Sequence, residues 1–132
     1  MINLNLMGKL TFKKEERLNK EKWIQELFEK GSSFNLYPFR VVYLPHPDPF
    51  YPAHQVLITV SARNFKNAVD RNTIKRRVRE AYRLNKLKLL SPGKWLIAYI
   101  YVAKEIVPSE MIHKRLTLTF EQLQWDRHDE KN

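Results

Sequence analysis

The residues best suited to chemistry are cations that share one face of a predicted helix. Positions 66–83 have the sequence KNAVDRNTIKRRVREAYR. At 100° per residue, one arc of about 100° holds the polar and basic side chains of Asn72, Lys75, Arg76, Arg79 and Arg83, and Arg77 falls on the opposite flank. Arginine binds phosphate oxygens in pairs and stacks on bases, so this face is typical of a nucleic-acid-binding surface.

The positive charge of the chain is concentrated in this same region. The 132 residues include 24 Lys and Arg against 14 Asp and Glu, a formal net charge of +10. Residues 63–88 alone contain ten basic and two acidic residues. A merely solvated surface mixes its signs, so this segregation predicts a polyanionic partner.

Side chains for protein-based catalysis are scarce. Cysteine is absent, which excludes a disulfide framework, a thiolate zinc site and a cysteine nucleophile. The four histidines lack the His-x-x-x-His or Glu-x-x-His spacing of metal sites, and most acidic residues occur as partners of cations on predicted helices. A nuclease that works without RNA is therefore disfavoured, and we predict neither a catalytic residue nor a metal ligand on this chain.

The elements that position the cations follow from hydrophobic spacing. Helical spacing predicts helices over 19–31 and 70–85 and a third that begins at 108–109. Runs of β-branched and aromatic residues predict strands over 38–44, 55–61 and 95–103, and four prolines within 45–52 predict an exposed, extended loop. The order of helix, two or three strands, helix, strand and helix predicts an α+β sandwich, one sheet with helices packed on it.

The length fits a single domain. We expect this domain to span residues 17–125, between a flexible N-terminal extension (1–16) and a flexible polar tail (126–132). No apolar run approaches the length of a membrane span, and targeting signals are weak. We therefore expect a cytoplasmic protein with no membrane partner.

The string AVDRNTIKRRVREAYR, preceded by VSARNFKN, resembles the signature of the protein subunit of bacterial ribonuclease P, in which an Arg-Asn-x-x-Lys-Arg core opens a basic helix. RLNKEKWIQELFEKGSSF resembles the first helix and glycine turn of that family, PFRVVYL its next strand and LIAYIYVA its late strand. The resemblance covers about residues 17–123. It implies the order α-β-β-β-α-β-α, with a left-handed crossover as in the second domain of a ribosomal protein.

The resemblance also implies a function. In this family a large RNA with bound Mg²⁺ is the catalyst, and the protein helps it to recognise precursor tRNA and to remove the 5′ leader. The expected partners are the catalytic RNA and precursor tRNA, and DNA is not expected. The positions that match the signature, and that we expect to contact the catalytic RNA, are Arg63, Lys66, Asn67, Arg71, Asn72, Lys75, Arg76, Arg79 and Arg83. Ala62 and Arg63 stand where many relatives have two lysines.

The family holds the leader in a cleft between the first helix and the sheet. The resemblance makes the candidates for leader contact Trp23, Phe28, Phe39, Arg40 and Tyr43. Aromatic residues at such spacing equally suit a hydrophobic core, so packing is an open alternative for Phe28, Phe39 and Tyr43. A general basic RNA-binding or ribosome-associated accessory protein is the alternative function. DNA binding is disfavoured because the basic helix lacks the second helix of a helix-turn-helix motif.

Overall fold

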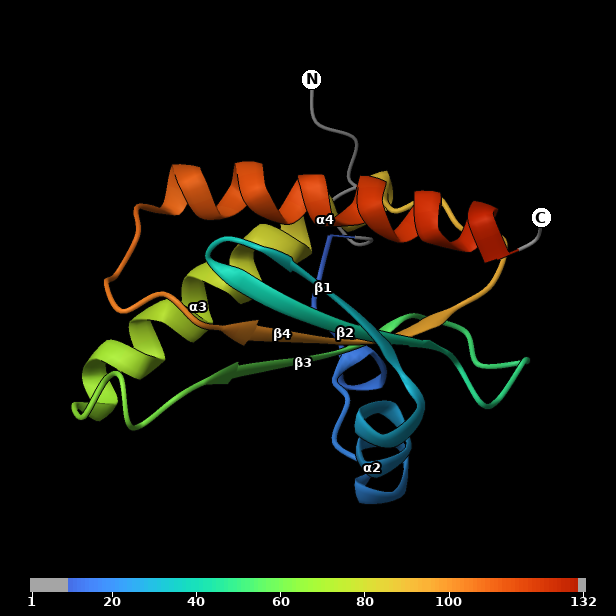
Figure 1. Cartoon of the computed structure of the whole chain (residues 1–132), viewed down its shortest axis with the longest axis horizontal. Coiled ribbons are helices and arrows are strands. Elements are labelled where there is room, and N and C mark those ends of the chain that lie inside the picture. The colour runs from blue at the N-terminus through green and yellow to red at the C-terminus, as the bar shows by residue number, and fades with distance from the viewer. Residues whose placement is uncertain (1–9, 131–132) are drawn as a thin grey trace.

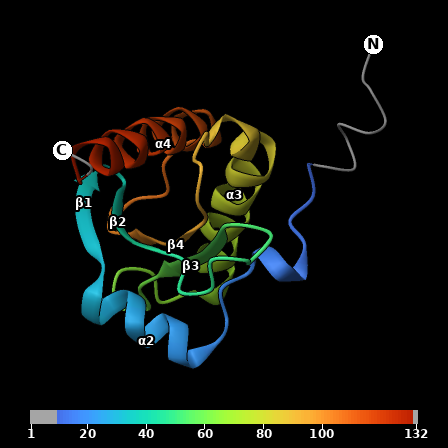
Figure 2. The same cartoon turned by 90° about the vertical axis from the view of Figure 1, so that its right-hand side faces the viewer.

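The computed structural model describes residues 10–130, with side chains described as far as Gln124. The elements, in chain order, are η1 (Lys14–Glu16), α2 (Glu21–Lys30), β1 (Ser32–Leu36), β2 (Phe39–Pro45), β3 (Gln55–Val60), α3 (Ala68–Asn85), η2 (Lys86–Lys88), β4 (Trp95–Tyr101) and α4 (Ser109–Glu130). Figures 1 and 2 show three layers: α2 covers one face of the sheet, and α3 and α4 cover the other. The fold is thus the predicted α+β sandwich.

The four strands form one mixed sheet in the order β1-β2-β4-β3. β2 pairs antiparallel with both β1 and β4, whereas β3 pairs parallel with β4. A parallel pair requires a crossover connection, and α3 supplies it. β4 is almost entirely apolar and buried because helices cover both faces of the sheet.

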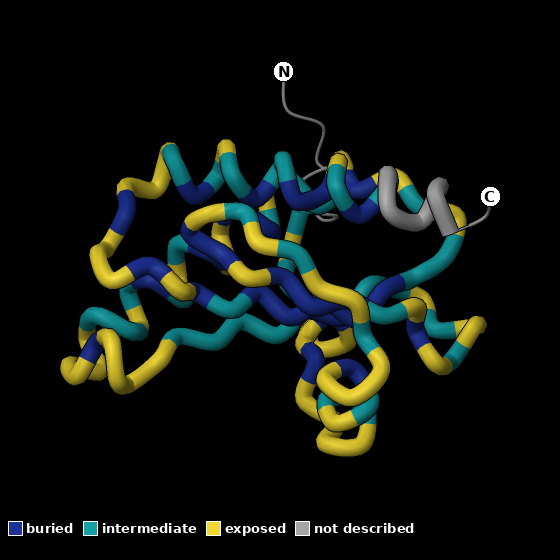
Figure 3. Tube along the Cα trace, in the orientation of Figure 1, coloured by how far each residue is buried: buried dark blue, intermediate teal, exposed yellow. Residues whose placement is uncertain are grey.

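Two apolar clusters hold the layers together. The larger cluster joins the sheet to α3 and α4 and includes Phe39, Tyr99, Ile74 and Leu116. The smaller one joins the opposite face to α2 through Leu27, Val42, Leu96 and Ala98, with Leu18 from the preceding segment. Figure 3 shows the resulting band of buried chain along β2 and β4. The sheet is therefore packed against helices on both of its faces.

The structure differs from the expected boundaries at both ends. The N-terminal segment is packed from Leu10 onward: Arg83 donates to the carbonyl of Leu10, and Phe12 meets Tyr82 edge-on at 5.8 Å between ring centroids. The prediction of a flexible extension over residues 1–16 is therefore wrong for residues 10–16. Residues 1–9 lie outside the described part of the chain. α4 continues past Trp125 to Glu130, where a flexible tail was expected, and residues 131–132 are not described.

None of the described helices has the length and apolar character that crossing a membrane requires.

Candidate RNA-binding surfaces

α3 turns one side toward the core and the other toward solvent. Ile74, Val78, Ala81 and Tyr82 are at most 1% exposed and anchor the helix against the sheet and α4. These positions recur every three or four residues, as an amphipathic helix requires. The cations between them are consequently held on a fixed, outward-facing surface.

Four residues that the sequence predicted to act together do gather on this surface. Asn72, Lys75, Arg76 and Arg79 line a shallow hollow of about 410 Å³, together with Val69 and Thr73. Asn72, Arg76 and Arg79 are exposed and Lys75 is partly buried. We call these four residues the basic face. Three of its four side chains are cations, so this face can attract the phosphates of a nucleic acid.

Other arginines of α3 are engaged within the protein. Arg71 donates to the carbonyls of Phe65 (2.6 Å) and Lys66 (2.9 Å), which fixes the loop before the helix. Arg77, on the opposite flank, donates to the carbonyl of Val107 at 3.0 Å. Both side chains therefore stabilise connections between elements.

Arg83 lies beyond the basic face and is also occupied. It donates to the carbonyl of Leu10 (2.7 Å) and forms an ion pair with Glu80 (2.5 Å). The hydrogen bond from this guanidinium lowers the pKa of Glu80 below its usual value. Arg83 thus ties the N-terminal segment to α3, although the sequence predicted contact with RNA.

The loop before α3 extends the positive surface. Arg63, Lys66 and Asn67 are all exposed. The backbone N–H of Arg63 donates to the hydroxyl of Ser61 (3.1 Å), which tightens the turn that presents the Arg63 side chain. Asn67 occupies the N-cap position of α3 without using its side chain to cap the helix. Its amide is accordingly not committed to capping.

A second surface lies between α2 and the sheet. Here a groove of about 430 Å³ is lined by Phe28, Gly31, Ser33, Arg40, Val42, Ile100 and Val102. We call it the α2 groove. Phe28 is 47% exposed and Arg40 is exposed, so an aromatic ring and a guanidinium both face a shallow apolar floor. This combination suits a single nucleic-acid strand, because bases stack on rings and the backbone attracts cations.

Two of the aromatic candidates lie on the wrong face of the sheet for this groove. Phe39 and Tyr43 are 1% and 4% exposed and belong to the cluster beneath α3 and α4. Side chains alternate along a strand, so Arg40 and Val42 face α2 while Phe39, Val41 and Tyr43 face the opposite way. The expectation that Phe39 and Tyr43 contact the leader is therefore wrong, and the alternative of core packing is correct.

Trp23 is also outside the α2 groove. Its ring meets His46 edge-on at 4.6 Å and Tyr51 at 5.6 Å, and the ammonium of Lys20 lies 4.4 Å from its centroid. Trp23 thus braces α2 against the loop between β2 and β3. Its partners come from distant positions, which spacing along the helix does not reveal.

The groove residues that the sequence analysis missed are Gly31, Ser33, Val42, Ile100 and Val102. Val42 follows from the alternation that begins at Arg40, so the strand pattern already contained it. Ser33 and Ile100 reach the groove through the pairing of β2 with β1 and β4, whereas Gly31 directly precedes β1 and Val102 directly follows β4. Within residues 10–124, no group of three or more His, Asp or Glu side chains is placed to hold a metal ion.

Comparison with known proteins agrees with this architecture. The family model for ribonuclease P matches residues 12–124. A ribonuclease P protein component from Porphyromonas gingivalis strain W83 is 38% identical over 98 residues, which cover 74% of this chain and 72% of the relative. One from Pasteurella multocida is 34% identical over 128 residues, 92% of this chain and 94% of the relative.

Solved structures with the same fold include the ribonuclease P proteins of Thermotoga maritima and Staphylococcus aureus. The Thermotoga protein has a TM-score of 0.67 at 25% identity and covers 81% of this chain and 96% of its own. The Staphylococcus protein has a TM-score of 0.66 at 25% identity and covers 82% and 94%. The chain therefore belongs to the family of ribonuclease P protein components, the protein subunits of a ribonucleoprotein endoribonuclease that processes tRNA.

Proposed function

We propose that this protein binds two RNAs through two separate surfaces: the catalytic RNA through the basic face and the preceding loop, and the 5′ leader of precursor tRNA through the α2 groove. The observation that carries the proposal is their placement on different sides of the molecule. The basic face lies on α3, whereas the groove lies beneath α2 on the opposite face of the sheet (Figure 2). An RNA bound to one surface therefore leaves the other surface accessible to a second RNA.

Charge supports the assignment of the catalytic RNA to α3. Along the basic face, Lys75, Arg76 and Arg79 follow one another at helical spacing, while Glu80 is neutralised by Arg83. Like charges at this spacing repel each other weakly in the free protein, and RNA phosphates relieve that repulsion. The resulting contact is to backbone phosphates and depends on the fold of the RNA more than on its sequence.

Shape supports the assignment of the leader to the α2 groove. The groove is shallow and open, and its floor is formed by apolar side chains of β2 and β4. A duplex is too wide and too rigid to place its bases against such a floor, whereas a single strand turns its bases toward Phe28 and its phosphates toward Arg40. The 5′ leader is a single-stranded part of precursor tRNA that mature tRNA lacks.

Catalysis is assigned to the RNA partner. The basic face and the α2 groove supply positive charge, stacking surface and apolar contact, which position RNA and do not break a phosphodiester bond. We assign the Mg²⁺ used in the reaction to the catalytic RNA, and the reaction to the cytoplasm, where precursor tRNA is processed.

Reconstitution tests this function. Ribonuclease P RNA is mixed with precursor tRNA at an Mg²⁺ concentration too low for the RNA to act alone, with and without the protein. We expect cleavage at the mature 5′ end only when protein and RNA are both present, because the protein offsets part of the repulsion between the two RNAs. Cleavage by the purified protein without RNA, or no stimulation of the RNA by the protein, would contradict the proposal.

A further inference from the structure

An exposed aromatic ring lies next to the α2 groove, in the turn between β1 and β2. This ring belongs to Tyr37, which forms the turn together with Pro38 and is 44% exposed. The aromatic residues on either side in sequence, Phe34 and Phe39, pack on other rings of the protein. Tyr37 is therefore the aromatic residue of this hairpin whose ring is open to a ligand.

The backbone joins this turn to the α2 groove. The N–H of Val102 donates to the carbonyl of Pro38 at 2.9 Å, which fixes the turn to the residue directly after β4. Val102 itself lines the groove and is 44% exposed. Ser33 also lines the groove and precedes Tyr37 by four residues, a separation of about 13 Å at the rise of a strand. Exposed surface thus continues from the groove to the turn.

Tyr37 is held in place by the loop that follows β4. Its hydroxyl donates to Oε1 of Glu105 at 2.8 Å. This hydrogen bond raises the pKa of Tyr37 above its usual value, so the phenol stays neutral. The carbonyl of Glu105 in turn accepts from the hydroxyl of the buried Tyr101 at 2.6 Å. A ring that is restrained in this way loses less conformational freedom when a ligand stacks on it.

The turn and the loop together repeat the chemistry of the α2 groove. Lys104, next to Glu105 in the same loop, is exposed and supplies a cation at this end of the sheet. In the groove, Phe28 and Arg40 form the corresponding combination of ring and cation. A single nucleic-acid strand uses both, because its bases stack on rings and its backbone attracts cations.

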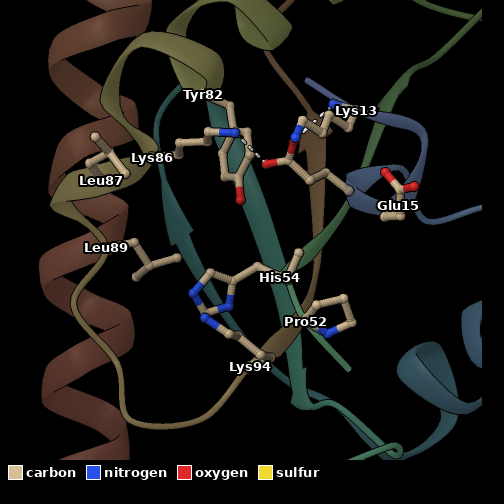
Figure 4. A pocket seen from close by; sticks show the side chains of 11 residues that line it. Lys13, Glu15, Pro52, His54, Tyr82, Lys86, Leu87, Leu89 and Lys94 are labelled. Atoms are coloured by element: carbon tan, nitrogen blue, oxygen red, sulfur yellow. Dashed lines mark hydrogen bonds and ion pairs between the residues drawn. The ribbon is translucent and has the colours of Figure 1, made fainter. Parts of the chain in front are cut away.

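A separate hollow of about 610 Å³, at the C-terminal end of α3, does not offer this combination (Figure 4). Its aromatic residue, Tyr82, is only 1% exposed. Lys86 forms an ion pair with Glu16 at 2.6 Å. Nδ1 of His54 accepts the backbone N–H of Trp95 at 2.9 Å. These contacts join the N-terminal segment to α3 and the loop before β3 to β4, so the residues of this hollow stabilise the fold.

We propose that Tyr37 extends the α2 groove and stacks a further base of the 5′ leader, so that one single strand runs from Phe28 past Arg40 and Val102 to Tyr37. This inference rests on the proposed function of the α2 groove, because the same strand occupies both. Only a leader long enough to span the groove reaches both rings. Tyr37 therefore makes the affinity for precursor tRNA depend on the length of the leader.

Binding of tRNA to the reconstituted holoenzyme tests this extension. The ligands are mature tRNA and precursor tRNAs with leaders of two and eight nucleotides. We expect Tyr37→Ala to weaken binding of the eight-nucleotide precursor by about fivefold or more, the lower end of the range for a base stacked on an aromatic residue. Binding of mature tRNA is unchanged, because it has no leader.

Tyr37→Phe separates stacking from a structural role of the turn. It keeps the ring and loses only the hydrogen bond to Glu105, so we expect it to keep most of the affinity for the eight-nucleotide precursor. A loss as large as that of Tyr37→Ala would assign the effect to the structure of the turn and overturn the stacking role.

Phe50→Ala is the matched control. Phe50 is 91% exposed in the loop between β2 and β3 and does not line the α2 groove, so its removal leaves binding of all three ligands unchanged. An equal loss for Phe50→Ala and Tyr37→Ala would overturn the assignment. With the two-nucleotide leader, Phe28→Ala and Tyr37→Ala do not both weaken binding, because two adjacent bases are too close together to reach both rings. Sensitivity of the short leader to both substitutions would contradict the path.

The eight-nucleotide precursor separates the extension from the groove itself. If Phe28→Ala weakens its binding and Tyr37→Ala, in a protein with the wild-type Tm, does not, the extension is overturned and the groove stands. If neither substitution weakens its binding, the leader-binding function of the groove fails together with the extension. If only Tyr37→Ala weakens its binding, the strand does not follow the groove, and the proposed path is wrong.

Discussion

At the scale of single residues, the arginines of α3 divide by what their guanidinium groups contact. Arg71, Arg77 and Arg83 donate to backbone carbonyls of neighbouring segments. Arg76 and Arg79 instead border the hollow of the basic face and are exposed. We therefore expect substitution within the first group to lower stability and substitution within the second to weaken RNA binding.

Replacing Arg76 and Arg79 together with Gln tests this division. Gln keeps helix propensity, so we expect the free energy of unfolding to change by no more than about 0.5 kcal/mol. Affinity for the catalytic RNA falls, and the slope of log K against log salt flattens by about 0.9, or somewhat less on structured RNA, for each phosphate that the variant no longer neutralises. Filter binding over a range of salt concentrations measures both the affinity and the slope.

The matched controls are Lys114→Gln and Arg77→Gln. Lys114 is an exposed cation on α4, and its replacement leaves both stability and the salt slope unchanged. Arg77→Gln removes the hydrogen bond to Val107 and so lowers stability by about 1 kcal/mol. A salt slope that falls as much for Lys114→Gln as for one basic-face residue would show that α3 is not the RNA surface.

Phe28 and Phe39 differ in exposure, so their replacement should affect different properties: Phe28 is half-exposed in the α2 groove and Phe39 is buried in the core. Phe28→Ala removes a half-exposed ring, so we expect affinity for precursor tRNA in the holoenzyme to fall by about 1–3 kcal/mol per stacked base, while affinity for mature tRNA is unchanged. Phe39→Ala empties a core position and lowers the free energy of unfolding by about 3–5 kcal/mol. Equal losses for both tRNAs with Phe28→Ala would remove Phe28 from the leader site.

The sequence predicted the basic face but not the side on which each aromatic of β2 lies. A helix that is polar on one side and apolar on the other defines its own solvent face, so Asn72, Arg76 and Arg79 could be grouped from spacing alone. β2 is apolar on both faces because α2 covers one and α3 and α4 cover the other. Alternation therefore separated Phe39 from Arg40 without indicating which of them faces α2.

At the scale of elements, the position of α2 depends on the close approach of Gly31 to β2. A Cβ atom at Gly31 would come closest to the carbonyl oxygen of Leu27 in α2, and it would lie 2.9 Å from the carbonyl oxygen of Tyr43 and 3.1 Å from Cγ1 of Val42 in β2. The φ angle of Gly31 is −72°, so the requirement is for space and not for an unusual backbone conformation. Gly31 also lines the α2 groove, which links the seating of the helix to the shape of the groove.

Gly31→Ala should therefore displace α2 and alter the groove. We expect a loss of about 1–3 kcal/mol in the free energy of unfolding, as is usual for overpacking, together with weaker binding of precursor tRNA. Ser32→Ala, at the exposed neighbouring position, is the control and leaves both unchanged. Denaturant unfolding and tRNA binding measure the two effects. An unaltered unfolding midpoint for Gly31→Ala would contradict the close packing of α2 on β2.

Elements with strong local patterns were predictable, and those held by distant partners were not. α3 and β4 follow from their own periodicity. β1 has the sequence SSFNL, lies at the sheet edge and is largely exposed, so the residue pattern left open whether two or three strands precede α3, and the family resemblance implied three. The loop before β3 was expected to be exposed, yet His46 is buried and pairs with Gln55 at 3.0 Å, a contact that only the fold creates.

At the scale of the whole molecule, the sheet separates the two surfaces that we propose bind RNA, the basic face and the α2 groove, and fixes their relative positions. The order β1-β2-β4-β3 puts β4 at the centre, where one face supports α3 and the other forms the floor of the α2 groove. Local sequence patterns do not determine this strand order. We propose that a protein built in this way joins a structured RNA, which it contacts through backbone phosphates, to a single strand.

The binding of two tRNA ligands to the reconstituted holoenzyme tests this central claim most directly. Dissociation constants are measured for precursor tRNA and for the same tRNA without its leader, each with the protein present and absent. We predict that the protein tightens binding of precursor tRNA and leaves binding of mature tRNA nearly unchanged, and that Phe28→Ala removes most of the difference. Equal tightening of both ligands by the protein would contradict a leader-binding groove between α2 and the sheet.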